Sequence, residues 1–309
     1  MPPSDPLRWA DLPTASLDLR GAPLDLRWTL ACGQAFRWRE SPDGWWMGVV
    51  AGSVLRVRVE DGALVYAVYP ELPFPRFWDD YLRLEFDLEG MYVDLAGVDP
   101  TLDYAFARWR GLRVLRQDPT ETICSFLCTT ANSIPRITRA IEGMSRLFGE
   151  SLATIDGSDY YSFPGLEALT TAAAPQLERE CNLGYRAHNL VRAVEEIRAR
   201  PPGWADSLRS RPYAEAKAEL TGVRGVGPKI ADCVCIFSLD KDEAVPVDTH
   251  VRQIAVELYM PELKARSLTA NVYTKVGDYF RERFGARAGW AQQYLFYWHL
   301  VRHREPPVL

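Results

Sequence analysis

Cysteine is scarce in this sequence, and its distribution argues against a cross-linked or metal-bound scaffold. The 309 residues contain six cysteines that are scattered along the chain: Cys32, Cys124, Cys128, Cys181, Cys233 and Cys235. Scattered cysteines are typical of reduced intracellular thiols. Their spacings give neither the paired C-x-x-C of a zinc site nor the closing four-cysteine loop of an iron–sulfur protein. We therefore expect no disulfide framework and no cysteine-ligated metal.

Long apolar runs are also absent. No stretch approaches the roughly 20 apolar residues that span a membrane, and residues 1–6 have neither the basic start nor the apolar run of a secretory signal. The sequence thus predicts a protein that neither enters a membrane nor is secreted, and that works in the cytoplasm at the bacterial nucleoid or in a nucleus. Its hydrophobic share of 47% and charged share of 25% are those of a globular chain.

An excess of positive charge is missing as well, since the formal net charge is −5. The acidity is confined to the first third of the chain. Residues 1–100 carry 9 Lys and Arg against 16 Asp and Glu, whereas residues 101–309 carry 27 against 25. The second part can therefore present a basic face, which permits DNA binding without requiring it.

Residues 1–100 have the pattern of a small antiparallel β domain. Three runs of aromatic and β-branched residues, separated by turn signals, predict strands at 45–50, 54–59 and 64–68. Two shorter runs, 28–30 and 36–38, are expected to extend the sheet. One or two helical turns are expected within 75–88.

After residue 100 the apolar residues take up helical spacing. Asp118, Pro119 and Glu121 supply an N-cap, a proline at the first helical position and an acid in the first turn. Further helices are expected at 133–147, 175–181, 187–198, 213–220, 229–239, 249–259, 268–284 and 290–301. The predicted fold is therefore α+β, with an antiparallel β domain in residues 1–100 and a mainly helical region in residues 101–309.

Segment 220–229 places Gly222, Gly225 and Gly227 between two of these predicted helices. Glycines let a backbone turn sharply and bring its N–H groups close to a phosphate at the start of the second helix. Backbone donors contact DNA without reading its sequence, as a protein that scans for rare damage requires. The same turn also fits a plain helix–helix connection, so this segment alone leaves both interpretations open.

Lys229 lies in the first turn of the second helix, directly after Pro228. The positive end of the helix dipole disfavours an ammonium group there and favours a nucleophilic amine. A solvated surface lysine is the alternative. The chain is rich in arginine and has only five lysines, namely Lys217, Lys229, Lys241, Lys264 and Lys275. A lysine in the hairpin is therefore unusual in a chain whose basic residues are mostly arginine.

Asp248 follows the apolar segment 244–247 and precedes the predicted helix 249–259. It would cap that helix whatever else it did. A carboxylate near a deoxyribose would also stabilise the positive charge that develops at C1′ as a base leaves, and would help to move protons to and from a lysine. Segment 245–250 is thus a candidate for the catalytic acid.

The hairpin, Lys229, residues 231–233 and the segment ending in Asp248 together resemble the 8-oxoguanine DNA glycosylase/AP lyase family of the helix-hairpin-helix superfamily. Segments 30–38, 127–136, 183–186 and 289–296 resemble its other motifs in the same order, so the resemblance covers residues 8 to 300 approximately. It implies excision of 8-oxoguanine and related oxidised purines from duplex DNA in base excision repair, through a Lys229 Schiff base and β-elimination.

The resemblance also implies a pocket for a base that has been flipped out of the duplex. Cys233 and Phe296 would sandwich the base, Gln292 would meet its Watson–Crick edge, and the carbonyl of Gly33 would accept the N7–H of 8-oxoguanine. Guanine has no proton at N7, so the Gly33 contact would discriminate against it. Residues four apart lie on the same face of a helix. Cys233 follows Lys229 by four residues, and Phe296 follows Gln292 by four, so each pair is expected to share one helix face.

DNA contacts are implied at several further positions. Tyr185 would enter the base stack, and Arg136 and Arg186 would recognise the cytosine left behind. The backbone at Gly225 and Gly227 would contact phosphate, with His250 near the DNA backbone. Carbonyls of Thr221, Val223 and Val226 would hold a monovalent or calcium-like ion that bridges to phosphate. No cofactor is expected beyond that ion.

One departure from the family pattern concerns the segment after the paired threonines. Where the family commonly has a run of asparagines, this chain has Ala131, so the asparagine that would fill the space of the extruded base is missing there, and the sequence leaves open whether Asn132 replaces it. Strict selectivity for cytosine opposite the lesion is therefore not expected. Arg224 in the hairpin offers an additional phosphate contact.

Three alternatives remain open from the sequence. A monofunctional glycosylase of the alkylpurine type would use water and would not need Lys229. A non-catalytic helix-hairpin-helix protein would bind DNA without excision, and an acidic adaptor would show no salt-dependent affinity for DNA. Action as a monomer is the simplest expectation.

Overall fold

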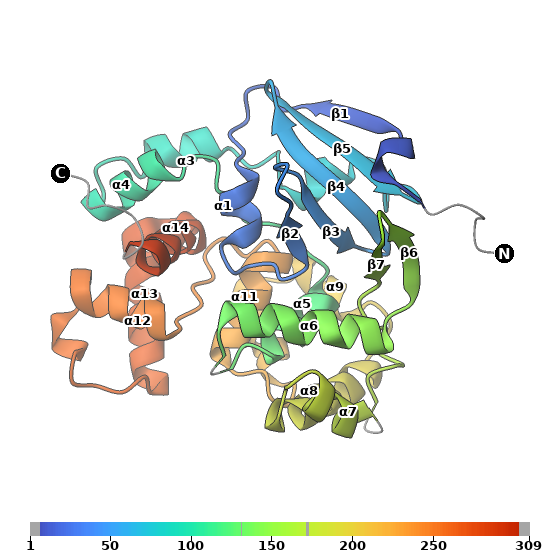
Figure 1. The fold of residues 1–309 in the computed structure, drawn as a ribbon. Helices are drawn as coiled ribbons and strands as arrows, with labels where there is room; N and C mark the ends of the chain where they lie inside the picture. The colour runs from blue at the N-terminus through green and yellow to red at the C-terminus, as the bar shows by residue number, and fades with distance from the viewer. Residues whose placement is uncertain (1–6, 131, 171–172, 303–309) are drawn as a thin grey trace.

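The computed structural model describes residues 7–130, 132–170 and 173–302. An antiparallel sheet lies at one end of the molecule, and helices make up most of the remainder (Figure 1). This arrangement confirms the predicted α+β class. Within the described residues, no helix is both long enough and apolar enough to cross a membrane.

The sheet has five strands in the order β1-β5-β4-β3-β2, with every neighbouring pair antiparallel. The strands are β1 (Thr14–Asp18), β2 (Trp38–Glu40), β3 (Trp46–Val50), β4 (Ser53–Glu60) and β5 (Ala63–Tyr69). Both residues of the turns Ala51-Gly52 and Asp61-Gly62 have positive φ, as a two-residue hairpin turn requires. The three predicted central strands are therefore confirmed to within about one residue.

The predicted strand at 28–30 is wrong. These residues lie in helix α1 (Leu26–Ala31), whose N-cap Asp25 accepts a hydrogen bond from the Trp28 amide at 3.2 Å. A short apolar run fits either period, and the capping carboxylate ahead of it favours the helix. Of the predicted strand at 36–38, only Trp38 belongs to β2.

Strands β2 to β5 separate α1 from the helices that follow it. Their bounds are α2 (Phe77–Tyr81), α3 (Leu88–Asp94), α4 (Pro100–Arg108), α5 (Pro119–Leu127), α6 (Ile134–Phe148), α7 (Ala174–Glu180), α8 (Tyr185–Arg198), α9 (Trp204–Ser207), α10 (Tyr213–Thr221), α11 (Pro228–Ser238), α12 (Thr249–Ile254), α13 (Ala270–Phe284) and α14 (Ala288–Val301). Each helix predicted after residue 100 is present. The predicted helix 249–259 is α12 followed by a π-helical turn at Ala255–Tyr259.

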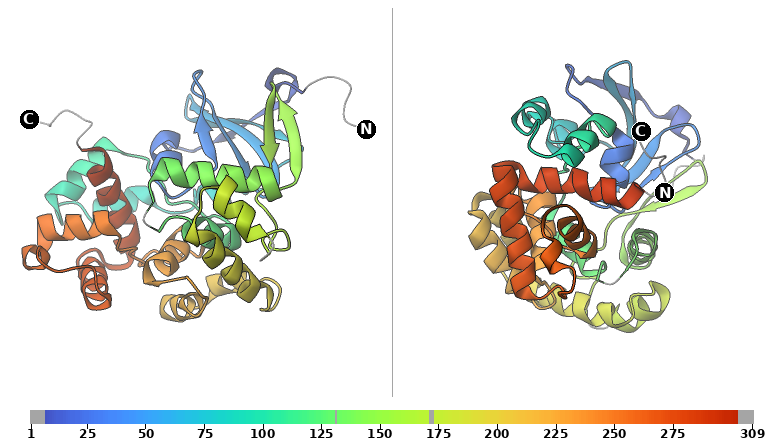
Figure 2. Two further views of the ribbon diagram at one scale, coloured as in Figure 1. Left: turned by 60° about the horizontal axis from the view of Figure 1, so that its bottom comes forward. Right: turned by 90° about the vertical axis from the view of Figure 1, so that its left-hand side faces the viewer.

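The sequence pattern did not reveal a second hairpin, formed by β6 (Ser151–Ile155) and β7 (Ser158–Tyr161). It runs beside the larger sheet in every view (Figure 2), where Ile155 forms a bridge with Leu7 and packs with Val54 in a small apolar cluster. The hairpin thus attaches the loop after α6 to the N-terminal sheet.

The main apolar core lies among the helices, and it also takes in Cys32 and Phe36 from the N-terminal part. A smaller core lies under the sheet against α1 and α2. Residues on both sides of position 100 therefore share one core, and the division of the chain at that residue stays a prediction.

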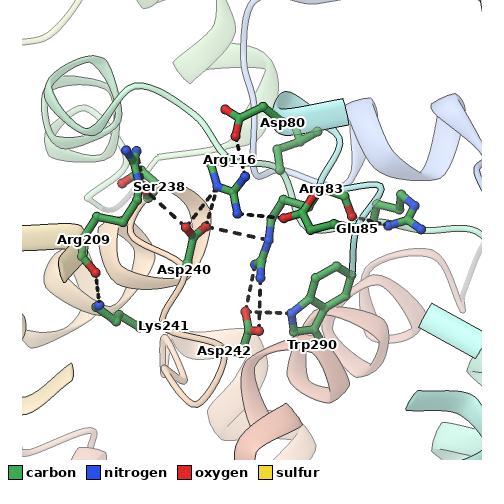
Figure 3. Close-up of polar contacts among 12 residues, drawn as sticks. Asp80, Arg83, Glu85, Arg116, Arg209, Ser238, Asp240, Lys241, Asp242 and Trp290 are labelled. Atoms are coloured by element: carbon green, nitrogen blue, oxygen red, sulfur yellow. Dashed lines mark hydrogen bonds and ion pairs between the residues drawn. The ribbon is translucent and has the colours of Figure 1, made fainter. Parts of the chain in front are cut away.

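Charged side chains join Arg83 of the N-terminal part, and Arg116 of the segment before α5, to the loop that follows α11 (Figure 3). Arg83 binds Asp242 through two hydrogen bonds of 2.8 and 3.1 Å, and Arg116 binds Asp240 at 2.9 Å. Asp242 also accepts the Trp290 indole N–H at 2.9 Å, and its carbonyl accepts the Gly289 amide at 2.7 Å. Asp242 therefore fixes the start of α14 against the segment that leads to Asp248.

Candidate active site

The loop between α10 and α11 has the geometry of a phosphate-binding hairpin. Gly225 has φ of +86°, a conformation that favours glycine. Val223 and Val226 are buried and hold the loop against the core. In the described part of the chain no side chain caps the start of α11 at Gly227. Its first N–H groups are thus left for an anion such as a DNA phosphate.

Lys229 is half-buried in the first turn of α11, where it meets the end of α5. Its Nζ donates a hydrogen bond of 3.0 Å to Thr129 Oγ1 and lies 5.1 Å from the centre of the Phe126 ring. Both contacts fix the position of the amine. The sequence placed Lys229 on this helix turn but gave no sign of Thr129 or Phe126 as its neighbours.

Asp248 is the N-cap of α12, as predicted, and its Oδ1 accepts the Val251 amide at 2.8 Å. The preceding residues Ala244, Val245 and Val247 are fully buried. Their burial fixes the backbone of segment 244–247, and with it the position of the Asp248 carboxylate.

The thiol of Cys233 lies within electrostatic reach of both proposed catalytic residues. Burial raises the pKa of Cys233 to about 12, while the positive charge of Lys229 acts to lower it and the negative charge of Asp248 acts to raise it. The thiol is therefore neutral at physiological pH. The structure thus gathers Lys229, Asp248 and Cys233 in one place.

Gly33 and Phe296 lie against each other in the expected base pocket. Gly33 has φ of +88°, and a Cβ built there would lie 3.7 Å from Phe296 Cε1 and only 3.0 Å from Ile134 Cδ1. A side chain at this position would therefore intrude on the space beside Phe296. The sequence did not identify Gln293, whose Nε2 donates to the Cys32 carbonyl at 3.3 Å and ties α14 to the Gly33 turn.

Gln292 carries an unsatisfied acceptor. Its side chain is buried, and Oε1 has no hydrogen-bond partner among the described residues. Such an atom costs about 1–3 kcal/mol when it stays unpaired. A ligand with N–H donors, such as the Watson–Crick edge of a purine, would remove that cost.

The residues expected to contact the rest of the DNA lie on the surface near the ends of α5, α6 and α8. Tyr185 is 57% exposed at the start of α8. The Arg186 guanidinium lies 4.8 Å from the Tyr185 ring centre and donates to the Thr130 carbonyl at 2.6 Å. Asn132 donates to the Cys128 carbonyl at 3.3 Å, and Arg136 is exposed in the first turn of α6. Position 131, where the sequence has alanine, lies outside the described residues.

His250 faces the pocket and contacts a second histidine that the sequence did not single out. Its ring meets Phe296 edge-on at 5.6 Å between centres. Its Nδ1 lies 3.2 Å from Nδ1 of His299. Burial, and to a smaller extent the charge of Arg302, lowers the pKa of His299 to about 4. The His250 ring therefore lies between Phe296 and His299 and contacts both.

The predicted ion ligands Thr221, Val223 and Val226 line a shallow hollow of about 590 Å³ at the hairpin. The carbonyl of Val223 already accepts the Val226 amide at 3.0 Å, which leaves it one lone pair. In the part of the chain that the structure describes, no cluster of three His, Cys, Asp or Glu side chains could hold a metal.

Comparisons with known proteins agree with this geometry. Residues 16–123 match the family model described as 8-oxoguanine DNA glycosylase, N-terminal domain. N-glycosylase/DNA lyase OGG1 of Arabidopsis thaliana is 37% identical over 289 residues, which cover 91% of this chain and 78% of the relative. The probable N-glycosylase/DNA lyase of Methanothermobacter thermautotrophicus is 30% identical over 300 residues, covering 88% of this chain and 92% of that protein.

A solved structure extends the likeness to three dimensions. The 8-oxoguanine glycosylase/lyase of Clostridium acetobutylicum, in complex with double-stranded DNA containing cytosine opposite 8-oxoguanine, has a TM-score of 0.80 and 33% identity to this chain. The match covers 91% of this chain and 92% of that protein. Sequence relatives that span most of the chain, together with this fold, establish that the protein belongs to the 8-oxoguanine N-glycosylase/DNA lyase family of helix-hairpin-helix enzymes.

Proposed function

We propose that this protein is a bifunctional DNA glycosylase and AP lyase that excises 8-oxoguanine and related oxidised purines from duplex DNA in base excision repair. The observation that carries the proposal is the placement of the Lys229 amine at the start of α11, beside the buried Cys233 thiol. An amine in this position supplies a nucleophile at the wall of a base pocket. No additional cofactor is needed for that step.

In the proposed reaction the neutral Lys229 amine attacks C1′ of the deoxyribose, and the bond from C1′ to N9 of the purine breaks. The base leaves with a proton on nitrogen, and the amine gives up one proton. The C1′–O4′ bond then opens, with a proton going to O4′, as the C1′=N double bond of the protonated Schiff base forms. Removal of a proton from C2′ then expels the 3′ phosphate. The Asp248 carboxylate stabilises the positive charge that develops on the sugar.

Specificity for the lesion is assigned to two acceptors. Gln292 Oε1 is buried and open to a donor on the Watson–Crick edge. The Gly33 carbonyl would accept the N7–H that 8-oxoguanine has and guanine lacks. Phe296, beside Gly33, would cover one face of the base, and Cys233 would cover the other.

Duplex DNA is the proposed partner of a monomeric enzyme in the bacterial nucleoid or a nucleus. The backbone N–H groups at Gly225 and Gly227 would bind phosphate, and a monovalent or calcium-like ion at the hairpin carbonyls would strengthen that contact. Replacing potassium by tetramethylammonium at constant ionic strength, with and without calcium, tests the ion. Unchanged DNA affinity in all cases would remove it from the proposal.

Borohydride trapping on duplexes with 8-oxoguanine opposite each of the four bases tests the main proposal. The native chain is compared with Lys229→Gln and with Lys264→Gln, a change at an exposed lysine. We expect a covalent adduct with the native chain and with Lys264→Gln, and none with Lys229→Gln. Adducts opposite bases other than cytosine would fit the alanine at position 131.

Other results separate the alternatives. Free base released without an adduct would identify a glycosylase that uses water. Binding with neither product would leave a DNA-binding protein only. Full activity in Lys229→Gln would overturn the assignment of the nucleophile.

A further inference from the structure

The hydroxyl of Thr129 makes two hydrogen bonds just beyond the end of α5. It lies 2.7 Å from the carbonyl oxygen of Phe126 and 3.0 Å from Lys229 Nζ. A carbonyl oxygen can only accept, so the single hydroxyl proton of Thr129 is committed to Phe126. Toward Lys229 the hydroxyl can therefore act only as an acceptor.

This polarity matters for a nucleophilic amine. A neutral amine has two N–H bonds and one lone pair, and only the lone pair forms the bond to carbon. A hydroxyl that donated to the amine would occupy the lone pair. An acceptor instead takes one N–H and leaves the lone pair free.

We propose that Thr129 is a positioning residue for Lys229, which takes an N–H of the amine so that the lone pair remains available for attack at C1′. This inference rests on the proposed function of Lys229 and adds a residue to it. Thr129 does not touch the reacting atoms; it acts through Lys229.

The surroundings hold this arrangement in place. The Phe126 ring, 5.1 Å from Lys229 Nζ, is packed against Phe237 and Phe36, with ring centres 5.6 and 5.5 Å away. The Thr129 amide also bonds to the Phe126 carbonyl, at 3.1 Å. Because the carbonyl is fixed by the end of the helix, the hydroxyl keeps its direction.

Thr129→Val and Thr129→Ser separate the acceptor from the packing. Valine keeps the branched shape and removes the oxygen, whereas serine keeps the oxygen and removes a methyl. Thr122→Val is a matched control, because Thr122 lies within α5, the helix that ends shortly before Thr129, and its hydroxyl donates a hydrogen bond of 2.6 Å to the Asp118 carbonyl. It makes no hydrogen bond to Lys229 in the described structure.

The measurements are the single-turnover rate of base release with enzyme in excess, borohydride trapping, and the dissociation constant for the lesion duplex. We expect Thr129→Val to lower the rate of release and trapping about 10-fold, the effect of one lost hydrogen bond in the transition state. The dissociation constant should change by less than about twofold. Thr129→Ser and Thr122→Val should keep the native rate within about threefold.

Two results would overturn the inference. One is a native rate in folded Thr129→Val, and the other is an equal loss in Thr129→Val and Thr129→Ser, which would show packing alone. If Thr129→Val does not fold, Thr129→Ala takes its place. Alanine lacks both the oxygen and the γ-methyl of threonine, and the same loss of rate is expected. Failure of the main proposal is distinguishable, since Lys229→Gln would then retain activity.

Discussion

Asp232 of α11 and Lys217 of α10 form an ion pair, with 2.7 Å between Asp232 Oδ2 and Lys217 Nζ. Asp232 follows Lys229 by three residues on the same helix. The carboxylate is fully buried, and it also accepts hydrogen bonds from Tyr213 at 2.6 Å and Tyr273 at 2.5 Å. The Tyr273 hydroxyl in turn lies 3.4 Å from the Val247 amide, next to Asp248. The pair therefore links the helix that carries the amine to the segment that carries the acid.

Asp232→Asn should reduce the free energy of unfolding by about 3 kcal/mol, because it leaves Lys217 without its counter-charge in a partly buried site. Urea denaturation measures the change. Asp278→Asn is the control: Asp278 pairs with Arg281 at 2.7 Å but is 63% exposed, and its loss should cost less than about 1 kcal/mol. Equal stabilities of the two variants would show that the buried pair does not hold α11.

The neighbours Gln292 and Gln293 should respond in opposite ways to the same substitution. Gln292→Leu removes a buried oxygen without a partner among the described residues, so the free energy of unfolding should stay level or rise by about 1 kcal/mol. Base release should fall by about 10-fold or more, since the lesion loses its acceptor.

Gln293→Leu is the matched contrast. It breaks the 3.3 Å hydrogen bond to the Cys32 carbonyl and should lower the free energy of unfolding by about 1 kcal/mol. Chemical denaturation and single-turnover release distinguish the two variants. A loss of stability in Gln292→Leu equal to that in Gln293→Leu would mean that Gln292 serves packing and not recognition.

Local signals predicted much of this molecule from the sequence. The helix starts at Asp118 and Asp248 were predictable because a cap needs only its own first turn. The turns at 51–52 and 61–62 were equally local. The hairpin and Lys229 could be placed for the same reason.

Features that depend on distant contacts were not predictable. Most residues of β1 are exposed, and the strand pairs with β5, some 50 positions later in the chain. Thr129 meets Lys229 across 100 residues, and His250 meets His299 across 49. Nothing in the local spacing marks such a threonine or histidine, because its role is set by which helix ends the fold brings together.

Asp248→Asn should separate the two roles of the carboxylate. Asparagine is nearly as good an N-cap as aspartate, so the hydrogen bond to Val251 should persist and the free energy of unfolding should change by less than about 0.5 kcal/mol. Loss of the negative charge should slow base release about 100-fold.

Asp87→Asn makes the same change at the cap of α3, where Asp87 accepts the Gly90 amide at 2.8 Å. It should leave the rate unaltered. Urea denaturation measures the free energy of unfolding of both variants, and single-turnover assays measure their rates of base release. A native rate in Asp248→Asn would leave this residue with capping alone.

His299 should make the fold less stable in acid. Its pKa is lowered to about 4 in the folded protein by burial and by nearby charges on Arg302 and His250, with Glu257 and Asp248 acting in the opposite direction. An unfolded histidine titrates near 6.5. Between these values the unfolded chain binds a proton that the folded chain does not, so this contribution is complete above about pH 6.5 and is lost as the pH falls toward 4.

The expected loss is on the order of 2–3 kcal/mol. His299→Gln cannot titrate, so the difference in free energy of unfolding between the native chain and this variant should shrink from pH 7 to pH 4.5. His188→Gln, at an exposed histidine on α8, should keep the native slope. Denaturant melts across this range measure both differences, and a constant gap between native and His299→Gln would show that folding does not lower the pKa of His299.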